Sequence, residues 1–415
     1  MEKINLQEPQ QPKFKKLKKE TKVFQDAVHG TISIPYACKV VVDTPEFQRL
    51  RRLRQLGMAY MVYPSATHTR FEHSLGVCHL AGLLAANLKE NQEELSIDEK
   101  DVLCVQLAGL CHDLGHGPLG HFWEGFARNK LKKEWIHEEM SVRMLDHMWE
   151  KNALKDSLKE VHDDDLAFIK AMIHPKGYPL PEKYRSKDFL LQIVSNEKTG
   201  IDVDKWDYFL RDSLHLGLKV TFDPKRFIEY SRVIEYQGEK FICFRDKMYR
   251  EVLELFQTRC VLHLKAYKHK VLHCIDLMIM DALHAEMDYN EEFEQMVSKF
   301  EDPEVFMKLT DDMVQRLRES RSGDVKKIFH RIDTRKLYKC KDEKDDGNKC
   351  GENEVKIEIN YGFEEKNPVD RVCFYNKKNP NNAERLLPDV SIFLPKSFQV
   401  EFRREINKHE AQDAQ

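Results

Sequence analysis

A histidine and an aspartate stand side by side at positions 112 and 113, inside the run Leu-Cys-His-Asp-Leu-Gly-His that begins at Leu110. Adjacent side chains on an α-helix point about 100° apart, so His112 and Asp113 can converge on one ion where a helix ends rather than within it. Two glycines and a proline follow within five residues, and they are typical of a helix end. Apolar residues at helical spacing lead into the pair from Val102 onward. The run therefore predicts a buried helix whose exit carries a metal site.

Two further stretches supply residues of the kind that bind metals. His73 lies in Arg-Phe-Glu-His-Ser-Leu-Gly, where a second apolar helical pattern begins. Asp204 begins a polar stripe of one helix, which continues through Tyr208, Arg211 and Asp212. Imidazole and carboxylate together suit a divalent ion such as zinc, iron, manganese or magnesium, with positions left open for water. The neighbouring cysteines lack CxxC spacing, so we do not expect a structural thiolate site. The predicted ligands are His73, His112, Asp113 and Asp204.

The order His, His-Asp, Asp on separate helices resembles the HD-domain phosphohydrolase superfamily. Longer motifs narrow the resemblance, because they are similar, nearly letter for letter, to the SAM-and-HD-domain deoxynucleoside triphosphate (dNTP) triphosphohydrolases of vertebrates. These motifs lie at residues 22–30, 43–51, 70–77, 101–106, 109–118 and 200–208. The similarity covers about residues 20–337 and resumes at 361–368. It implies cleavage of dGTP and other dNTPs to the deoxynucleoside and inorganic triphosphate, which would lower dNTP pools.

The composition fits a globular protein that neither crosses a membrane nor is driven as a whole onto nucleic acid. The chain has 415 residues, of which 41% are hydrophobic, enough for one large core or two domains. Its formal net charge is only −3, and no apolar run approaches the ~18 residues of a membrane span. The N-terminus lacks a signal-peptide pattern, and ten scattered cysteines are typical of reduced thiols in an intracellular protein. The resemblance favours the nucleus, with the cytoplasm as the alternative.

Helical periodicity dominates, so the expected fold is mainly α, with an HD-type helical core, short β-hairpins and a smaller mixed α/β lobe. We expect four parts: a disordered basic tail (1–20), the catalytic helical domain (21–283), a C-terminal regulatory or oligomerisation lobe (284–402) and a polar tail (403–415). Within the helical domain, strands are expected at 31–34 and in a hairpin over 232–243. The C-terminal lobe should contain helices near 303–319 and 322–330, and strands at 355–359 and 369–375.

Two segments allow several readings. The basic tail is either a solvated tail, a nuclear-import patch or an arm that contacts phosphates. The charged stretch 339–354 reads as a low-complexity loop, in which Cys340 and Cys350 are exposed bystanders rather than metal ligands, since no histidine flanks them.

The family resemblance also implies catalytic and substrate residues. A leaving deoxyribose oxygen needs a proton, which an imidazole with an ordinary pKa of about 6.5 can donate near neutral pH. His116, His121 and His137 occupy the corresponding positions, and the sequence leaves open which one is the acid. The remaining positions match residues that contact phosphates (Arg70, Lys205, Arg259), the sugar (Gln55, Leu56, Tyr208, Asp212) and the base (Tyr267). The resemblance implies Zn, Fe or Mn at the His/Asp site and Mg²⁺ with the nucleotide.

Regulation is expected to differ from that of the family, whose members assemble into tetramers when guanine nucleotide and dNTP bind. The matching guanine-site residues are Lys22, Val23, Asp43, Gln48 and Arg51. The matching second-site residues are Arg226, Arg245, Lys247, His269, Lys270 and Lys377. However, Gln25, Thr31 and Glu251 stand where the relative has Asn, His and Asn. The stretch 339–354 also replaces several dozen residues, and the SAM domain and the last hundred or so residues of the relative have no counterpart. We expect retained chemistry, a homo-oligomer that is at least a dimer, and nucleotide-driven assembly that is weakened, altered or absent.

Two alternatives remain at this point. An HD phosphohydrolase acting on another nucleotide, such as a phosphodiesterase, is disfavoured by Gln55, Tyr208 and Asp212. A catalytically silent regulator that binds nucleotide, or binds single-stranded nucleic acid weakly, and pairs with a full-length paralogue is disfavoured by the complete ligand set. The family also connects to antiviral defence and DNA repair, and those expectations follow from the resemblance alone.

Overall fold

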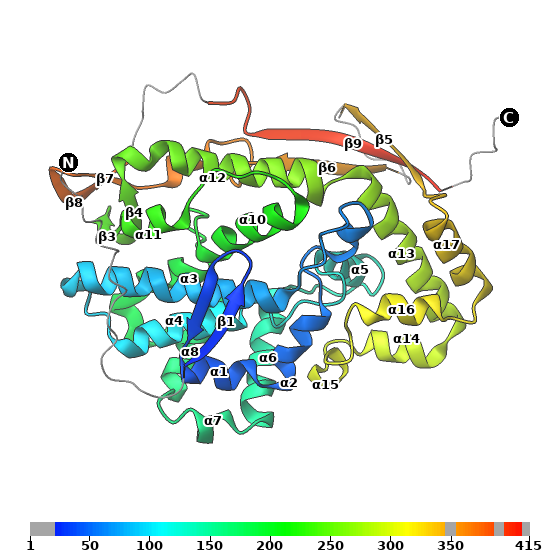
Figure 1. The fold of residues 1–415 in the computed structure, drawn as a ribbon, viewed down its shortest axis with the longest axis horizontal. Coiled ribbons are helices and arrows are strands. Elements are labelled where there is room, and N and C mark those ends of the chain that lie inside the picture. Colours follow the sequence, from blue (N-terminus) through cyan, green and yellow to red (C-terminus); the bar gives the residue numbers. More distant parts are fainter. Residues whose placement is uncertain (1–20, 345–353, 386–393, 409–415) are drawn as a thin grey trace, which may run out of the picture.

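The computed structural model describes residues 21–344, 354–385 and 394–408. The expected basic tail, Cys350 and the last residues of the expected polar tail lie outside these ranges. Helices dominate the described chain, and the sheets are small, so the prediction of a mainly α fold is confirmed (Figure 1).

The helices differ widely in length. The long ones are α3 (Arg70–Asn91), α4 (Glu99–Cys111), α5 (His121–Asn129), α6 (His137–Lys151), α8 (Asp163–Ile173), α10 (Val203–Leu216), α12 (Tyr249–Leu262), α13 (Lys270–Tyr289), α14 (Glu291–Ser298) and α17 (Gly323–Asp333). The short ones are α1 (Tyr36–Val42), α2 (Pro45–Gln48), α7 (Leu154–Ser157), α9 (Leu191–Val194), α11 (Pro224–Glu229), α15 (Pro303–Phe306) and α16 (Asp312–Arg318). Single-turn and irregular helical segments include η1 (Arg49–Arg52), η2 (Gly57–Met61), η4 (Glu182–Leu190), η5 (Asp246–Met248) and the π-helical η6 (His263–Tyr267).

Three helices at the centre, α3, α4 and α10, carry most of the candidate site. The first turn of α3 is fixed by a capping box, in which Thr69 and Glu72 satisfy each other's backbone N–H groups. Helix α4 ends at Cys111 with His112 at its C-cap, so the expected helix exit is confirmed. Helix α10 approaches α3 closely at Gly76, where a Cβ atom would collide with Asp207 of α10. This close approach brings the ends of the three helices to one place.

The strands form three separate sheets. They are β1 (Lys22–Asp26), β2 (Gly30–Ile34), β3 (Ser231–Tyr236), β4 (Glu239–Arg245), β5 (Lys339–Lys344), β6 (Glu354–Asn360), β7 (Phe374–Asn376), β8 (Asn379–Glu384) and β9 (Gln399–Asn407). The sheet orders are β1-β2, β3-β4-β7-β8 and β5-β9-β6. The expected hairpin is confirmed, since β3 and β4 pair antiparallel about Gln237 and Gly238. Strand β7 pairs with β4 in parallel, so the C-terminal part of the chain extends this hairpin.

The C-terminal part departs from expectation in three places. Residues 369–375 are not one strand, because Pro368 and the capping side chain of Asn367 start a 3₁₀-helix at 368–371. Helix 303–319 is interrupted between α15 and α16, while the helix expected at 322–330 is present as α17. Strand β5 forms where the charged loop was expected, and it pairs with β9, which includes residues 403–407 of the expected polar tail.

The reading of Cys340 as an exposed bystander was wrong. Cys340 is partly buried against the core and forms a disulfide with the buried Cys274 of α13. A contact between residues 66 positions apart leaves no local pattern, which is why the sequence did not reveal it. The expectation of reduced thiols holds for the other described cysteines, which are free and, apart from the partly buried Cys260, buried.

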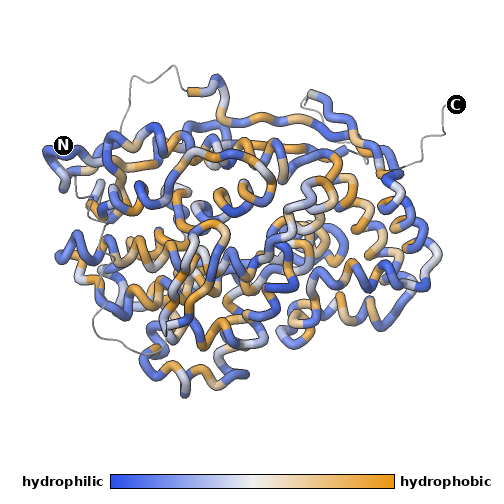
Figure 2. The backbone as a smooth tube through the Cα atoms, in the orientation of Figure 1, coloured by the Kyte–Doolittle hydropathy of each residue, from blue (hydrophilic) through white to orange (hydrophobic). Residues whose placement is uncertain are grey.

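One large apolar core includes residues from β2 to β7, and a small second cluster lies within the β3-β4-β7-β8 sheet. Figure 2 shows apolar segments gathered on the inner sides of the helices and polar segments on the outside. In the described part of the chain, every helix is too short or too polar to cross a membrane.

Candidate metal centre and active site

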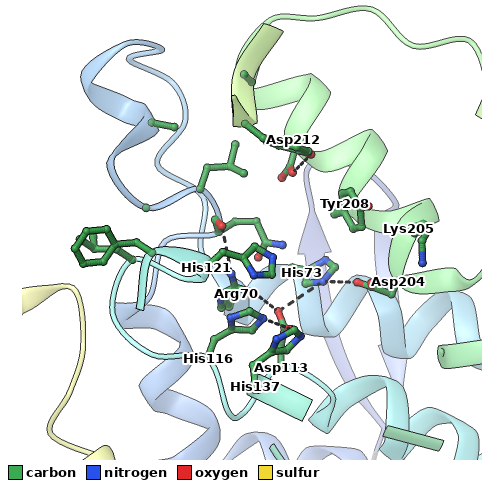
Figure 3. A pocket seen from close by; sticks show the side chains of 18 of the residues that line it. Arg70, His73, Asp113, His116, His121, His137, Asp204, Lys205, Tyr208 and Asp212 are labelled. Atoms are coloured by element: carbon green, nitrogen blue, oxygen red, sulfur yellow. Dashed lines mark hydrogen bonds and ion pairs between the residues drawn. The ribbon is translucent and has the colours of Figure 1, made fainter. Parts of the chain in front are cut away.

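The structure brings the predicted site residues together around one cavity of about 660 Å³. The cavity lies where the ends of α3, α4, α5, α6 and α10 meet (Figure 3). Residues of α12, η6 and α13 also line it. Its lining includes every residue predicted to bind metal (His73, His112, Asp113, Asp204), to transfer protons (His116, His121, His137) or to contact substrate (Gln55, Leu56, Arg70, Lys205, Tyr208, Asp212, Arg259, Tyr267).

The four predicted ligands face one another. His73 Nε2 lies 3.1 Å from an oxygen of Asp204 and 3.7 Å from Asp113. His112 Nε2 lies 3.3 Å from the same Asp204 oxygen and 3.4 Å from Asp113. Donors that bind one ion at about 2.0–2.2 Å stand about 3–3.5 Å apart. The spacings among His73, His112 and Asp204 fit a shared divalent ion, and Asp113 lies close to this group but slightly farther from His73. His112 Nε2 is also buried without a hydrogen-bond partner, as expected of an atom that binds a metal.

Hydrogen bonds on the far side of each imidazole fix its orientation. His112 donates from Nδ1 to the Gly109 carbonyl oxygen at 2.8 Å, and His73 donates from Nδ1 to Asp207 at 2.7 Å. In both rings Nε2 is therefore the nitrogen that faces Asp204 and is placed to bind a metal. Such second partners hold a ligand in place and make it more basic.

Asp207 is a functional residue that the sequence reasoning missed. Its buried carboxylate accepts hydrogen bonds from His29, His73 and Arg211. Burial alone would raise the pKa of Asp207, but the Arg211 guanidinium and the two histidines hold it well below its usual range. Arg211 also reaches Asp26 of β1, so the β1-β2 hairpin braces the site. Asp207 could have been found in the sequence from its i, i+4 spacing to Arg211 on α10, which is typical of an ion pair.

The three predicted acid histidines lie together beside the metal centre. The rings of His116 and His137 stack at 4.1 Å, and His121 approaches both edge-on. Glu124, a second residue that the sequence reasoning missed, accepts from His137 Nδ1 at 2.7 Å and from His121 Nδ1 at 3.2 Å. Glu124 could have been found in the sequence from its position three residues after His121, because residues at this spacing lie side by side on a helix.

The surroundings of His116 and His137 shift the pKa values of these two imidazoles in opposite directions. Burial and the nearby cations Arg70 and His137 hold the pKa of His116 well below its ordinary value. Burial also opposes the charge of His137, but the hydrogen bond to Glu124 raises its pKa overall. A protonated imidazole near neutral pH is therefore expected at His137 and not at His116.

Cationic side chains line the cavity on either side of the metal centre. Arg70 donates to Asp113 at 2.6 Å, and Lys205 pairs with the buried Asp202 at 2.8 Å. Arg259 of α12 donates to the Asn360 carbonyl oxygen at 2.7 Å, which ties this guanidinium to the end of β6. Burial would lower the pKa of Lys205, but Asp202 and Asp204 raise it, so this lysine remains charged.

The opposite end of the cavity holds a hydrogen-bonded carboxylate. Asp212 accepts from His68 Nε2 at 2.7 Å and from the Tyr267 hydroxyl at 2.6 Å. His68 is buried and stacks on His215. The side-chain oxygen of Gln55 is buried in the same cavity without a partner among the described residues. The carboxylate of Asp212 and the side-chain oxygen of Gln55 are both hydrogen-bond acceptors, which suits a ligand that carries hydroxyl groups.

The residues matched to regulatory positions lie outside the cavity lining. Those of the first set lie near the start of the described chain, where Gln48 accepts from Arg51 at 2.8 Å. In the second set, Arg226 and Lys247 both contact the ring of Tyr230. Glu251 pairs with Arg226 at 2.7 Å, so the carboxylate that departs from the family is bound to one of the matched cations.

Comparisons with known proteins agree with this geometry. The HD domain family matches residues 70–212, from the first turn of α3 to the last turn of α10. The chain is 40% identical to the bovine deoxynucleoside triphosphate triphosphohydrolase SAMHD1 over 433 residues, which covers 91% of this chain and 73% of the relative. It is also 40% identical to the human protein, covering 91% and 69%. The chain belongs to the SAMHD1 family.

The SAMHD1 family extends beyond vertebrates. A SAMHD1 homolog of Dictyostelium discoideum is 36% identical over 92% of this chain and 77% of its own length. The aligned span with the bovine SAMHD1, 433 positions, exceeds the 415 residues of this chain, so the bovine protein contains residues without a counterpart here. The prediction of an HD-domain enzyme of this family is confirmed, and its His/Asp groups are compatible with a divalent metal.

Proposed function

We propose that this protein is a metal-dependent triphosphohydrolase that cleaves dGTP and other dNTPs into the deoxynucleoside and inorganic triphosphate. One observation carries the proposal. A single cavity joins His73, His112 and Asp204 at metal-ligand spacing, with Asp113 next to them, to three clustered histidines and a set of cations. SAMHD1 relatives named for this activity, at 40% identity, give the substrate class.

Different residues of the cavity would bind the metal and the phosphates. His73, His112, Asp113 and Asp204 would hold Zn, Fe or Mn, which supplies the Lewis acidity for attack of water on the α-phosphorus. Arg70, Lys205 and Arg259 bind phosphate oxygens, and Mg²⁺ accompanies the nucleotide. Each charge-assisted contact contributes roughly 1.5–3 kcal/mol.

The cleaved bond leaves a negative charge on the deoxyribose 5′ oxygen, which must receive a proton. The stacked and edge-on histidines around Glu124 are placed to donate it, and the raised pKa of His137 keeps a proton available near neutral pH. At the other end, Asp212 and Gln55 bind the sugar hydroxyl, and Tyr267 lies next to the base. A site built to hydrogen-bond one hydroxyl discriminates strongly among sugars.

Product analysis by chromatography tests the proposal. The purified protein is mixed with dGTP and with Mg²⁺ plus Mn²⁺ or Fe²⁺, in the presence and absence of GTP. Deoxyguanosine and inorganic triphosphate in equal amounts are expected, whereas release of phosphate or pyrophosphate would refute the assigned bond cleavage. Binding of dNTP without any product would instead favour the silent regulator.

We also propose that nucleotide-driven assembly is weakened or altered relative to SAMHD1. The support is Glu251, whose carboxylate neutralises Arg226 where a second-site nucleotide would need that cation. The charged stretch 339–354, where the family carries a longer segment, points the same way. Size-exclusion chromatography with and without GTP and dNTP tests this, and a sharp shift to a tetramer would refute it. Consumption of dNTPs in the nucleus, with effects on viral DNA synthesis and repair, is the corresponding cellular role.

A further inference from the structure

Two helical segments, η2 and α13, also contribute residues to the cavity wall. Tyr267, whose hydroxyl binds Asp212, comes just before α13 in the chain. Leu272 and Asp276 follow on α13, four residues apart and therefore on one face, and both line the cavity. Helix α13 packs against η2, so the lining residues of these two elements border the same part of the cavity.

The part of the cavity wall that η2 and α13 form is apolar except at one side chain. Helix η2 contributes Gly57, Met58 and Ala59 to the lining, and α13 contributes Leu272. Asp276 is the one polar side chain that the described residues of η2 and α13 add to the cavity wall. An apolar wall with one polar group suits an apolar ring that carries a hydrogen-bonding edge.

Asp276 is partly buried, and its carboxyl group lacks the partners that an acid in such a place normally has. No hydrogen bond or ion pair from a described residue reaches it, and burial raises its pKa to about 7. Other acids of the cavity, such as Asp113 and Asp212, each bind a neighbouring cation or hydrogen-bond donor. An unpaired carboxyl in a cavity wall costs stability in the free protein, and a ligand with N–H donors offsets that cost.

We propose that Asp276 recognises the base of the substrate by accepting hydrogen bonds from its Watson–Crick edge, and that it favours guanine. The inference rests on the proposed function and adds base selection to it. Guanine presents two adjacent donors, the ring N1–H and the N2 amino group, which match the two oxygens of a carboxylate. Adenine and cytosine place a ring acceptor beside their amino group, and thymine places carbonyl oxygens on both sides of its one N–H.

The test compares kcat/KM for dGTP and dTTP in the wild type and in the Asp276→Asn variant. The amide keeps the size of the side chain and loses one acceptor, so the ratio of dGTP to dTTP should fall about tenfold or more. A ratio that stays within about twofold of the wild-type ratio would overturn the inference. Because the two substrates are compared within one protein preparation, partial misfolding affects both values and cancels from the ratio.

Asp288 on the same helix provides a matched control. It is exposed and does not line the cavity, so Asp288→Asn should keep the wild-type ratio.

A second readout, equilibrium binding of deoxyguanosine and thymidine, needs no catalysis. If the wild type hydrolyses no dNTP, the proposed function fails, while tighter binding of deoxyguanosine that Asp276→Asn abolishes would still support the inference. Equal binding of the two nucleosides by the wild type would overturn it.

Discussion

The Nδ1 atom of His73 lies 2.7 Å from a carboxylate oxygen of Asp207, a buried residue that follows Asp204 by three positions on α10. One helix therefore supplies both a predicted metal ligand and the group that orients another ligand. Arg211, one turn further on, holds Asp207 in turn. Arg211 and Asp207, which are not among the predicted ligands, therefore hold the predicted ligand His73 in its orientation.

Asp207→Asn should weaken metal binding. The amide can no longer accept strong hydrogen bonds from both His73 and Arg211, so His73 loses its fixed orientation and part of its basicity. Affinity for the divalent ion should fall by about 10- to 100-fold, measured by calorimetric titration of the metal-depleted protein. Exposed Glu229 provides a control, and Glu229→Gln should bind metal as the wild type does. Equal affinity in both variants would contradict the orienting role.

Asp204→Ala should abolish turnover and leave the fold intact. Asp204 is the ligand whose oxygen lies closest to both imidazoles, and its loss leaves three of the four donors. The side chain is partly exposed to the cavity, so its removal leaves no unfilled space in the core. The measurement is dNTP hydrolysis beside circular dichroism and metal content. Residual activity above about a tenth of wild type would contradict the four-ligand arrangement.

The sequence predicted those parts of the site that are encoded in short motifs. The glycines and the proline that follow His112 and Asp113 are local signals of a helix end, and the structure places that end at Cys111. Glu124 and Asp207 were within reach of the same reasoning, since each lies three or four residues from a partner on its own helix.

Other parts depend on contacts between distant residues, which no local pattern encodes. His29 contacts Asp207 across 178 positions, and the packing of the β1-β2 hairpin against α3, next to α10, brings them together. Cys340 likewise meets Cys274 because β5 packs beside α13. In the segment 369–375, apolar content suggested a strand, but Pro368 and Asn367 decided the local structure.

Glu124→Gln should shift the pH dependence of kcat. Burial tends to lower the pKa of His137, and the hydrogen bond to Glu124 is the strongest influence that raises it. In the wild type the imidazolium therefore persists above the ordinary pKa of about 6.5, and activity that needs this proton declines only at higher pH. Without the carboxylate, the pKa of His137 falls, and the alkaline limb of the kcat profile should move to lower pH by about one unit or more.

Exposed Glu139 on α6 provides the control for this profile, since it pairs with Arg143 and not with His137. Glu139→Gln should keep the wild-type pH dependence. An alkaline limb that stays in place in Glu124→Gln would show that His137 does not supply the proton. His121→Ala, measured in parallel, should lower kcat more than it raises KM, because the proton is needed only in the transition state.

Glu251→Asn should increase the response of the protein to nucleotides. In the wild type the carboxylate of Glu251 pairs with Arg226 at 2.7 Å, and a triphosphate at that place would have to displace it and would be repelled by its charge. The amide removes the repulsion and frees the guanidinium, which also contacts the ring of Tyr230.

Light scattering after size-exclusion chromatography, with GTP and dNTP added, should show a larger shift in mass for the variant than for the wild type. Glu235→Gln, at an exposed position of β3, should behave as the wild type. Identical masses for all three proteins under these conditions would show that the Arg226–Glu251 pair does not limit assembly.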